Sequence, residues 1–326
     1  MVSLTILLAA CIPSSDPAPV PTTASDLSSL EVSAGQLAPP FEGATSNYTV
    51  TVGNGIASTM VTATTFEPGA TLQINNQPAQ SGQPFGPIAL NVGQNPIPVV
   101  VTPKGSAPKS YTITIIRSAN VNLSSLVFSA GPLSPGFASD TVNYTVSAPN
   151  SAAQTTITPT AEQAGSTITI GGAQVTSGQV FGPVPLNVGS NNFVIQVRGV
   201  DTITTKTYTV QVIRAASSNA TLSDLQVFSL SLSPAFSPTT TCYVVSNAGL
   251  FTQAILVTAI VSDPTASLFV NGQATGSGQP VTVLILQRDP TPTSIPVEVR
   301  AQDTVTAMSY VLHVYHLADP TPGTCP

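Results

Sequence analysis

The side chains that could support acid–base or metal chemistry in this sequence are few. A chain of 326 residues contains two histidines, His313 and His316. They lie three positions apart in an alternating segment, so a β-strand would place them on opposite faces, where they cannot share a zinc ion in a simple geometry. No Gly-x-Ser-x-Gly turn offers a nucleophile for a Ser-His-Asp triad. We therefore expect no catalytic residue and no enzyme activity, and we expect His313 to be a water-facing strand residue.

The first of the three cysteines, Cys11, has the setting of a lipid attachment site. It follows an apolar run that is too short to span a bilayer, which needs about 20 residues. The segment from Leu8 to Cys11 looks like a bacterial lipobox, which predicts a signal peptide over residues 1–10 and a lipidated Cys11 with a Pro-rich tether over residues 11–25. No Lys or Arg precedes the run, which leaves open a start codon upstream of Met1, or a soluble protein with an apolar N-terminus.

If Cys11 carries a lipid, its partner is a membrane. The protein would then belong to the bacterial cell envelope, on the cell surface or in the periplasm, and we favour the outer membrane.

The two remaining cysteines, Cys242 and Cys325, form an even pair, which predicts a disulfide in an oxidising compartment. Cys242 stands directly before a tyrosine, at the position where two earlier copies of the same pattern have Asn47 and Asn143. Cys325 lies in the C-terminal tail and must fold back to reach it. Closing a loop of about 80 residues would stabilise the fold by roughly 4 kcal/mol in the chain-entropy model.

One long pattern occurs three times, and its period predicts the domain organisation. A Leu-Ser-x-Leu element begins at Leu27, Leu123 and Leu222, at spacings of 96 and 99 residues. Each copy continues with Leu-x-Pro-x-Phe and then a tyrosine. A period of this length is that of a small domain, whereas solenoid repeats are much shorter. We predict three domains and a C-terminal tail, over residues 26–118, 119–216, 217–318 and 319–326.

Strict alternation of apolar and polar residues closes every copy, as in Tyr111–Ile115. This period of two predicts strands with one buried face, and no comparable stretch has helical spacing. Between two short apolar runs each copy has a dipeptide that tolerates positive φ, as a two-residue type I′ hairpin requires. These dipeptides are Asn75-Asn76, Gly171-Gly172 and Asn271-Gly272. We predict an all-β fold of three tandem immunoglobulin-like sandwiches, each with about seven strands.

Taken together, these elements resemble the cadherin-like β-sandwich domain of bacterial surface proteins. The ordered set is Leu-Ser-x-Leu, Leu-x-Pro-x-Phe, a Tyr-x-Val strand, an Asn-Val-Gly-x-Asn turn and a closing Tyr-Thr-x-x-Val/Ile-x-Arg, and it covers residues 26 to about 317. The third copy departs most. Residues 284–290 lack the Asn-Val-Gly-x-Asn signature, and His316 replaces the closing Arg117 and Arg214.

The resemblance to cadherin-like domains does not imply a calcium site in this sequence. True cadherins hold calcium between domains with clustered acidic motifs, whereas no two of the 14 acidic residues here lie within two positions of each other. An oxygen-rich calcium shell needs several carboxylates brought together. We therefore expect no metal and no cofactor.

Composition argues against two further classes. Only 7% of the residues are charged, and the net charge of -6 provides no basic stripe for phosphate contacts, so nucleic acid is not an expected partner. A hydrophobic fraction of 42% is too high for a disordered chain.

Aromatic residues that recur at matching positions are expected to be core residues, and the exceptions are candidates for contact. Phe251 lacks an aromatic counterpart in the other copies, and the segment containing Gln287, Arg288 and Asp289 is peculiar to the third copy. We name these four residues as candidate ligand-binding residues, in the most divergent domain.

Two function classes remain. The first is a non-enzymatic surface lipoprotein whose sandwiches act as a stalk, or as an adhesion module that binds a surface protein or a polysaccharide through loops. The alternative is an accessory or carbohydrate-binding subunit of an extracellular enzyme system. Between passive spacer and specific binder the sequence leaves the choice open.

Overall fold

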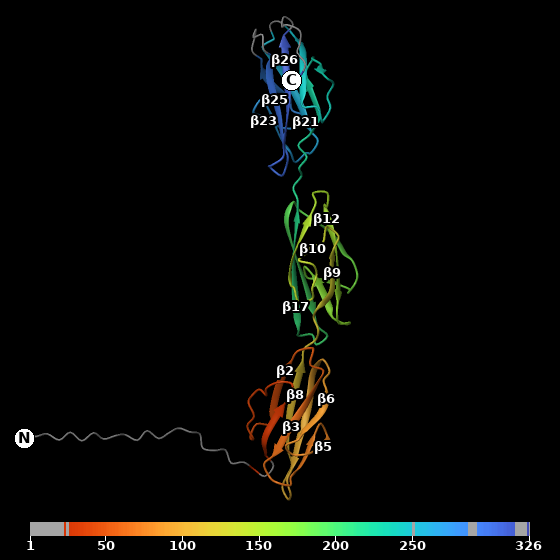
Figure 1. Ribbon diagram of the computed structural model, residues 1–326, viewed down its shortest axis with the longest axis vertical. Coiled ribbons are helices and arrows are strands. Elements are labelled where there is room, and N and C mark those ends of the chain that lie inside the picture. Colours follow the sequence, from red (N-terminus) through yellow and green to blue (C-terminus); the bar gives the residue numbers. More distant parts are fainter. Residues whose placement is uncertain (1–22, 24–25, 250–251, 286–291, 317–324, 326) are drawn as a thin grey trace, which may run out of the picture. The chain divides into compact units, whose positions relative to one another are not determined.

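A computed structural model of the protein describes residues 23, 26–249, 252–285, 292–316 and 325 (Figure 1). Strands form three successive groups, and each group folds into two facing sheets. Within the described residues the secondary structure consists of strands and turns, with no helix. The predicted fold class, all-β with three tandem sandwiches, is confirmed.

The first sandwich has eight strands among the described residues. One sheet has the order β1 (Leu27–Val32), β3 (Ser58–Thr65) and β6 (Pro84–Ala89). The other has the order β2 (Asn47–Val52), β8 (Lys109–Arg117), β7 (Gly93–Thr102), β4 (Thr71–Ile74) and β5 (Gln77–Ala79).

The second sandwich repeats this plan with one additional short strand. One sheet has the order β15 (Phe181–Pro185), β12 (Gln154–Ala161) and β9 (Leu123–Phe128). The other has the order β10 (Leu133–Ser134), β11 (Asn143–Ala148), β17 (Thr205–Arg214), β16 (Gly189–Arg198), β13 (Thr167–Ile170) and β14 (Ala173–Val175).

The third sandwich has the same plan as the second. One sheet has the order β18 (Leu222–Val227), β21 (Ala254–Val261) and β24 (Val281–Leu284). The other has the order β19 (Leu232–Ser233), β20 (Cys242–Ala248), β26 (Ala307–His316), β25 (Thr293–Arg300), β22 (Ser267–Val270) and β23 (Gln273–Thr275). The predicted number of about seven strands per copy was slightly low, because the very short strands have no visible alternation.

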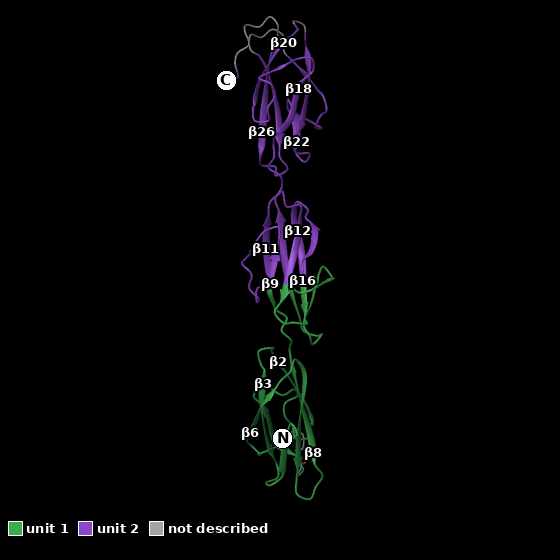
Figure 2. Cartoon of the chain, turned by 90° about the vertical axis from the view of Figure 1, so that its right-hand side faces the viewer, with its two compact units in different colours: residues 1–124, 160–177, 196–207 green, residues 125–159, 178–195, 208–326 purple. Residues whose placement is uncertain are grey.

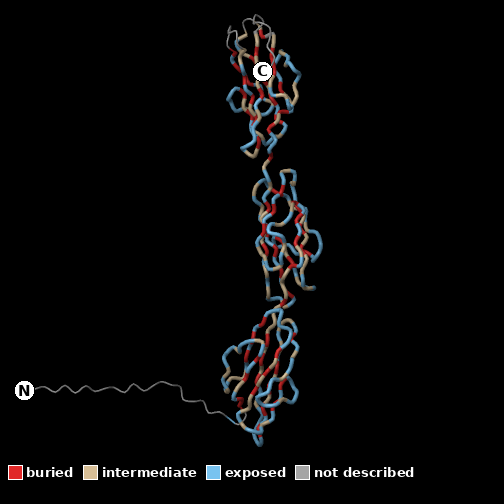
Figure 3. The backbone as a smooth tube through the Cα atoms, in the orientation of Figure 1, coloured by how far each residue is buried: buried red, intermediate tan, exposed pale blue. Residues whose placement is uncertain are grey.

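The core of each sandwich is built by the predicted alternation. In β8, Tyr111, Ile113 and Ile115 are fully buried, while the residues between them are partly exposed. Buried positions therefore alternate with intermediate and exposed positions along the backbone of each sandwich (Figure 3). Full burial of one such aliphatic side chain contributes about 1.5–3 kcal/mol.

Two further predictions from local sequence are confirmed by the backbone. Asn75 and Asn76 have φ of 50° and 60°, and the Gly171-Gly172 and Asn271-Gly272 dipeptides are also positive at both positions. Asn95, at the end of the Asn-Val-Gly-x-Asn turn, accepts a hydrogen bond from Asn91 N at 2.8 Å through Oδ1 and donates to Asn91 O and Ile115 O. Its side chain thus closes the turn against the last strand.

The paired tyrosines of each sandwich are core residues whose hydroxyls bind the backbone. Tyr48 is 1% exposed, and its Oη donates to Glu42 O at 2.7 Å and accepts from Glu42 N. Tyr144 and Tyr243 make the same contacts with residues six positions earlier. Because a buried hydroxyl must be paired, each tyrosine fixes the loop before its strand.

The closing arginine of the repeat joins the last strand to two loops. Arg117 donates to Leu90 O and Asn54 O, both at 2.7 Å, and Arg214 does the same with Leu186 O and Asn150 O. These bonds give the Arg of the repeated motif a structural role.

Two compact units cover the chain (Figure 2). One comprises residues 1–124, 160–177 and 196–207, and the other comprises residues 125–159, 178–195 and 208–326. The first sandwich is contained in one unit and the third in the other, while strands of the second belong to both.

The segment before the second sandwich is held by one carboxylate. Ala119 is 4% exposed, and its N donates to Oδ2 of Asp201 at 2.9 Å. Asp201 also accepts hydrogen bonds from Ile203 N, Thr204 N and Thr204 Oγ1. Burial alone would raise the pKa of Asp201, but these four hydrogen bonds outweigh it and lower the pKa to about 2.

Asp201 should make the second sandwich sensitive to acid. Because its folded pKa is depressed, its contribution is present above the unfolded pKa of about 3.9 and is lost as the pH falls towards about 2. We expect Asp201→Asn to cost about 1 kcal/mol at neutral pH, allowing for solvent screening, and the difference from the unmodified chain to vanish near pH 2. Amide hydrogen exchange in β9 and β16, measured across this pH range, checks the result.

Glu162→Gln is the control, because Glu162 lies in the same sandwich and uses its backbone N to bind Asn122 O. A constant difference between Asp201→Asn and the unmodified chain at every pH would contradict the expectation.

The third sandwich contains a disulfide between Cys242 and Cys325, with a Cα–Cα distance of 5.9 Å. Cys242 begins β20, which lies beside the last strand β26 in parallel. The bond joins residues 83 positions apart, so it links the end of the chain back to the body of this sandwich.

Reduction should destabilise the third sandwich selectively. In the chain-entropy model, opening a loop of this length costs up to roughly 4 kcal/mol. We expect the double variant Cys242→Ser, Cys325→Ser to speed hydrogen exchange in β25 and β26 while exchange in β7 and β8 stays unchanged. The first sandwich is the internal control, because it contains no cysteine. Equal acceleration in both sandwiches would be the contradicting result.

Candidate functional site

The candidate residues named from the sequence fall outside the part of the chain that the structure describes. This holds for Phe251, for Gln287, Arg288 and Asp289, and for the expected lipidation site Cys11. They stay predictions. The described residues of the same third sandwich nevertheless contain a hollow that the sequence did not reveal.

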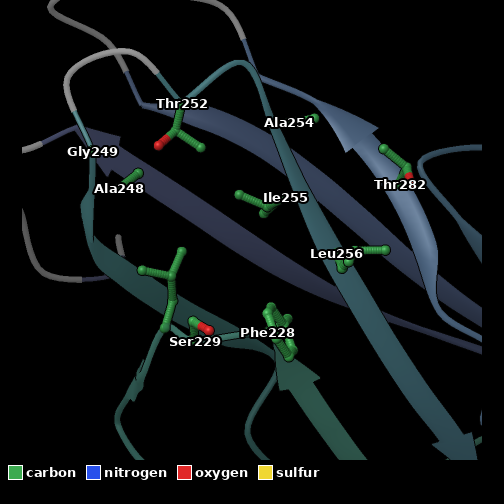
Figure 4. Close-up of a pocket in the computed structure, with 10 residues that line it drawn as sticks. Phe228, Ser229, Ala248, Gly249, Thr252, Ala254, Ile255, Leu256 and Thr282 are labelled. Atoms are coloured by element: carbon green, nitrogen blue, oxygen red, sulfur yellow. The ribbon is translucent and has the colours of Figure 1, made fainter.

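This hollow, of about 400 Å³, lies at one end of the third sandwich (Figure 4). It is bordered by the end of β18, the end of β20, the first part of β21 and one residue of β24. Its size falls within the usual range for small-ligand pockets, roughly 300–1,000 Å³. The lining residues are Phe228, Ser229, Leu230, Ala248, Gly249, Thr252, Ala254, Ile255, Leu256 and Thr282.

At the same place, the first two sandwiches have a small polar cluster. Ser33 Oγ lies 3.3 Å from Thr59 Oγ1 and accepts a hydrogen bond from Met60 N at 2.8 Å. The second sandwich repeats this with Ser129, whose Oγ lies 3.4 Å from Thr155 Oγ1 and accepts from Thr156 N.

The third sandwich replaces this polar cluster with apolar side chains. Phe228 N donates to Leu256 O at 3.0 Å, just as Ser33 N donates to Met60 O, so the backbones correspond. Phe228 thus stands in place of the serine, and Ile255 in place of the threonine. The exchange replaces two hydroxyls that lie within hydrogen-bonding distance of each other with an aromatic ring and an aliphatic side chain, both of which line the hollow.

The water-facing side of the three-stranded sheet in the third sandwich is also unusually apolar. We call its four exposed large residues the apolar face: Phe228 at 74% exposure, Leu284 at 74%, Ile260 at 39% and Leu256 at 38%. The corresponding residues of the first sandwich are Ser33, Ala89, Thr64 and Met60, and those of the second are Ser129, Pro185, Thr160 and Thr156. Contiguous exposed apolar surface typically marks an interaction site.

The chemistry of the hollow is that of a binding surface. The described residues of its lining include no charged side chain, and their side-chain polar groups are the hydroxyls of Ser229, Thr252 and Thr282. Such a site suits an uncharged group that presents an apolar surface with a few hydrogen-bonding atoms.

One contact between a histidine and a serine could have been mistaken for catalytic machinery. His313 Nδ1 lies 3.0 Å from Ser294 Oγ, across the β25–β26 pair. Both residues point outward from the sheet, where His313 was expected. We interpret the contact as a cross-strand pair of the kind that stabilises sheets.

A lysine at the start of the last strand binds the start of the first strand in each of the first two sandwiches. Lys109 Nζ lies 2.5 Å from Asp26 Oδ1 and joins the start of the last strand to the start of the first. Burial alone would raise the pKa of Asp26, but hydrogen bonds from Lys109 and Thr23 lower it. The second sandwich has Lys206 Nζ 2.8 Å from Asn122 Oδ1 at the same place.

Among the described residues, no group of three or more His, Cys, Asp or Glu side chains could hold a metal ion. Within that part of the chain, no helix is long and apolar enough to cross a membrane.

The chain is 38% identical over 97 residues to a protein of Evansella cellulosilytica named as a putative membrane protein. The match spans 30% of this chain and 14% of that relative.

Solved structures with similar folds include a mouse cadherin-23 fragment, EC22-24, at 12% identity, covering 86% of this chain and 99% of that one with a TM-score of 0.24. Another is the I67-I69 fragment of titin, at 10% identity, covering 83% and 96% with a TM-score of 0.26.

The family comparison matches the repeats directly. The model of the cadherin-like beta sandwich domain matches residues 27–118, 123–215 and 222–317, one segment for each sandwich. These segments cover most of the sequence and contain the motifs that carried the resemblance. The chain therefore belongs to the family of cadherin-like β-sandwich domain proteins.

Proposed function

We propose that this protein is a non-enzymatic module of the bacterial cell envelope, in which the third sandwich contacts a partner. The observation that carries the proposal is the apolar face beside the hollow, at positions where the first two sandwiches have mostly small or polar residues. The first two sandwiches then act as spacer domains, because their corresponding hydroxyls bind each other and their backbone.

The partner that we favour is a surface polysaccharide or protein that offers an uncharged, partly apolar patch. Phe228 provides an exposed aromatic ring, and Thr252 and Thr282 provide hydroxyls elsewhere in the lining of the same hollow. A sugar ring has the same combination of an apolar face and hydroxyl groups. This observation also supports the second candidate function, a carbohydrate-binding accessory subunit of an extracellular enzyme system.

The proposal that the protein is located in the cell envelope rests on the expected lipidation of Cys11 and on the disulfide between Cys242 and Cys325. A lipid on Cys11 would hold the sandwiches at a membrane through the Pro-rich residues 11–25, and we favour the outer membrane. The bond between Cys242 and Cys325 suits an oxidising compartment.

Lipidation can be tested in cells. We expect a bacterium that expresses the complete chain to incorporate labelled palmitate into it, and Cys11→Ala to abolish the incorporation and release the protein from the membrane fraction. Cys325→Ala is the matched control, and it should stay labelled. Labelling that persists in Cys11→Ala would contradict the anchor without touching the binding proposal.

Binding by the third sandwich can be tested by restoring the residue of the other copies. We expect Phe228→Ser to lower retention of the complete chain on immobilised envelope polysaccharides, or on intact cells, by about tenfold, because burial of a phenylalanine side chain on binding is worth about 1.5–3 kcal/mol. Pull-down on purified polysaccharide and on protease-treated cells separates the glycan partner from the protein partner.

Val305→Ser is the control for this measurement, since Val305 is 86% exposed in the same sandwich but lies away from the hollow. Equal retention of Phe228→Ser and the unmodified chain, with the fold intact by hydrogen exchange, would overturn the proposal that Phe228 makes the contact.

A further inference from the structure

The strand β24 has an open edge. Among the described residues it pairs with β21 alone, in the register Ile255 to Val283 and Leu256 to Thr282. Ile285 N donates to Gln253 O, which fixes the phase of the antiparallel ladder. Hydrogen-bonded and non-bonded pairs alternate along such a ladder, so Thr282 and Leu284 direct their N–H and C=O groups away from β21, toward the open side.

The corresponding strands of the first two sandwiches protect this edge with proline. β6 contains Pro84 and Pro87, and β15 contains Pro183 and Pro185. Both also have a register shift in their pairing with the neighbouring strand. Proline has no N–H to offer, and a bulge bends an edge away from a flat partner. β24 has neither protection, and its register with β21 is regular.

The other edges of the third sandwich are less suited to pairing. β18 has the charged Asp224 beside a register shift, and β19 and β23 have two and three residues. In the described part of this sandwich, β24 is therefore the edge that combines regular geometry with a neutral sequence.

The sequence of β24 favours association with itself. Val281, Thr282, Val283 and Leu284 are β-branched or aliphatic, and residues 273–285 contain no charged side chain. Pairing between two copies through residues 273–285 therefore brings no like charges together within that segment. Leu284 is mostly exposed, so an approaching strand can cover it.

We propose that two copies of this chain associate through antiparallel pairing of their β24 strands. A two-fold axis at Val283 places Thr282 of each copy opposite Leu284 of the other. Each such pair exchanges two N–H···O bonds, so the pairing forms four hydrogen bonds and joins two three-stranded sheets into one. The two Leu284 side chains lie on the same face of the joined sheet, near the axis, and the two apolar faces become continuous.

Sedimentation equilibrium of the complete chain tests the pairing. We expect a reversible equilibrium between monomer and dimer, with Leu284→Lys weakening it about tenfold because it removes an apolar side chain from the joined face and places two like charges diagonally across the axis. Thr282→Pro should weaken it similarly, since it removes an outward N–H and no bond to β21. Val305→Lys places a charge at another exposed apolar residue of this sandwich and should leave the equilibrium unchanged.

Amide hydrogen exchange provides a readout that association through another surface would not give. The amides of Thr282 and Leu284 should become protected as the concentration rises, while the amide of Val283, which faces β21, stays protected throughout and reports that the strand is folded. A chain that stays monomeric, a dimer that survives both Leu284→Lys and Thr282→Pro, or a dimer with unprotected Thr282 and Leu284 amides would overturn the proposal.

Discussion

Each sandwich depends on the burial of its last strand. In the first sandwich β8 lies between the parallel strand β2 and the antiparallel strand β7, and its inward residues are fully buried. Tyr111 adds a hydroxyl that accepts from Leu27 N, so the same strand also fixes the start of β1 in the facing sheet. Tyr310 repeats this with Leu222 N in the third sandwich. The cores could diverge elsewhere, but these tyrosines bring the two sheets together.

Much of this architecture could be predicted from local sequence, because its determinants are local. Alternation in Tyr111–Ile115 predicts a strand with one buried face, and Asn75-Asn76 predicts a turn with positive φ at both positions. Recurrence at matching positions identified the aromatic residues of the core, because Tyr48, Tyr144 and Tyr243 recur and are all buried. The disulfide partners could be named because only two cysteines remained after Cys11.

The hollow and the open edge could not be predicted in the same way, because both depend on pairing between distant strands. The register between β18 and β21 is needed to see that Phe228 occupies the position of Ser33 and Ser129. In the first two sandwiches those serines contact threonines. A closer comparison of the three copies offered one signal, since Pro87 and Pro183 have no equivalent in Val281–Leu284. The side chain of Asn95 reaching Ile115 O is likewise a contact between segments 20 residues apart.

The parallel pairing of β2 with β8 has a mechanical consequence. Leu27 N bonds to Tyr111 Oη, so β1 and β8 begin at the same end of the sandwich, and the chain leaves after Arg117 at the opposite end. Tension applied through the chain therefore acts along the strands, across interstrand hydrogen bonds that are perpendicular to the strands in the antiparallel pairs and slanted in the parallel pair. Such bonds are loaded in shear and must yield together, whereas bonds loaded in line with the force would unzip one at a time. A domain with this geometry is suited to carrying load between a fixed point and whatever is held at the far end.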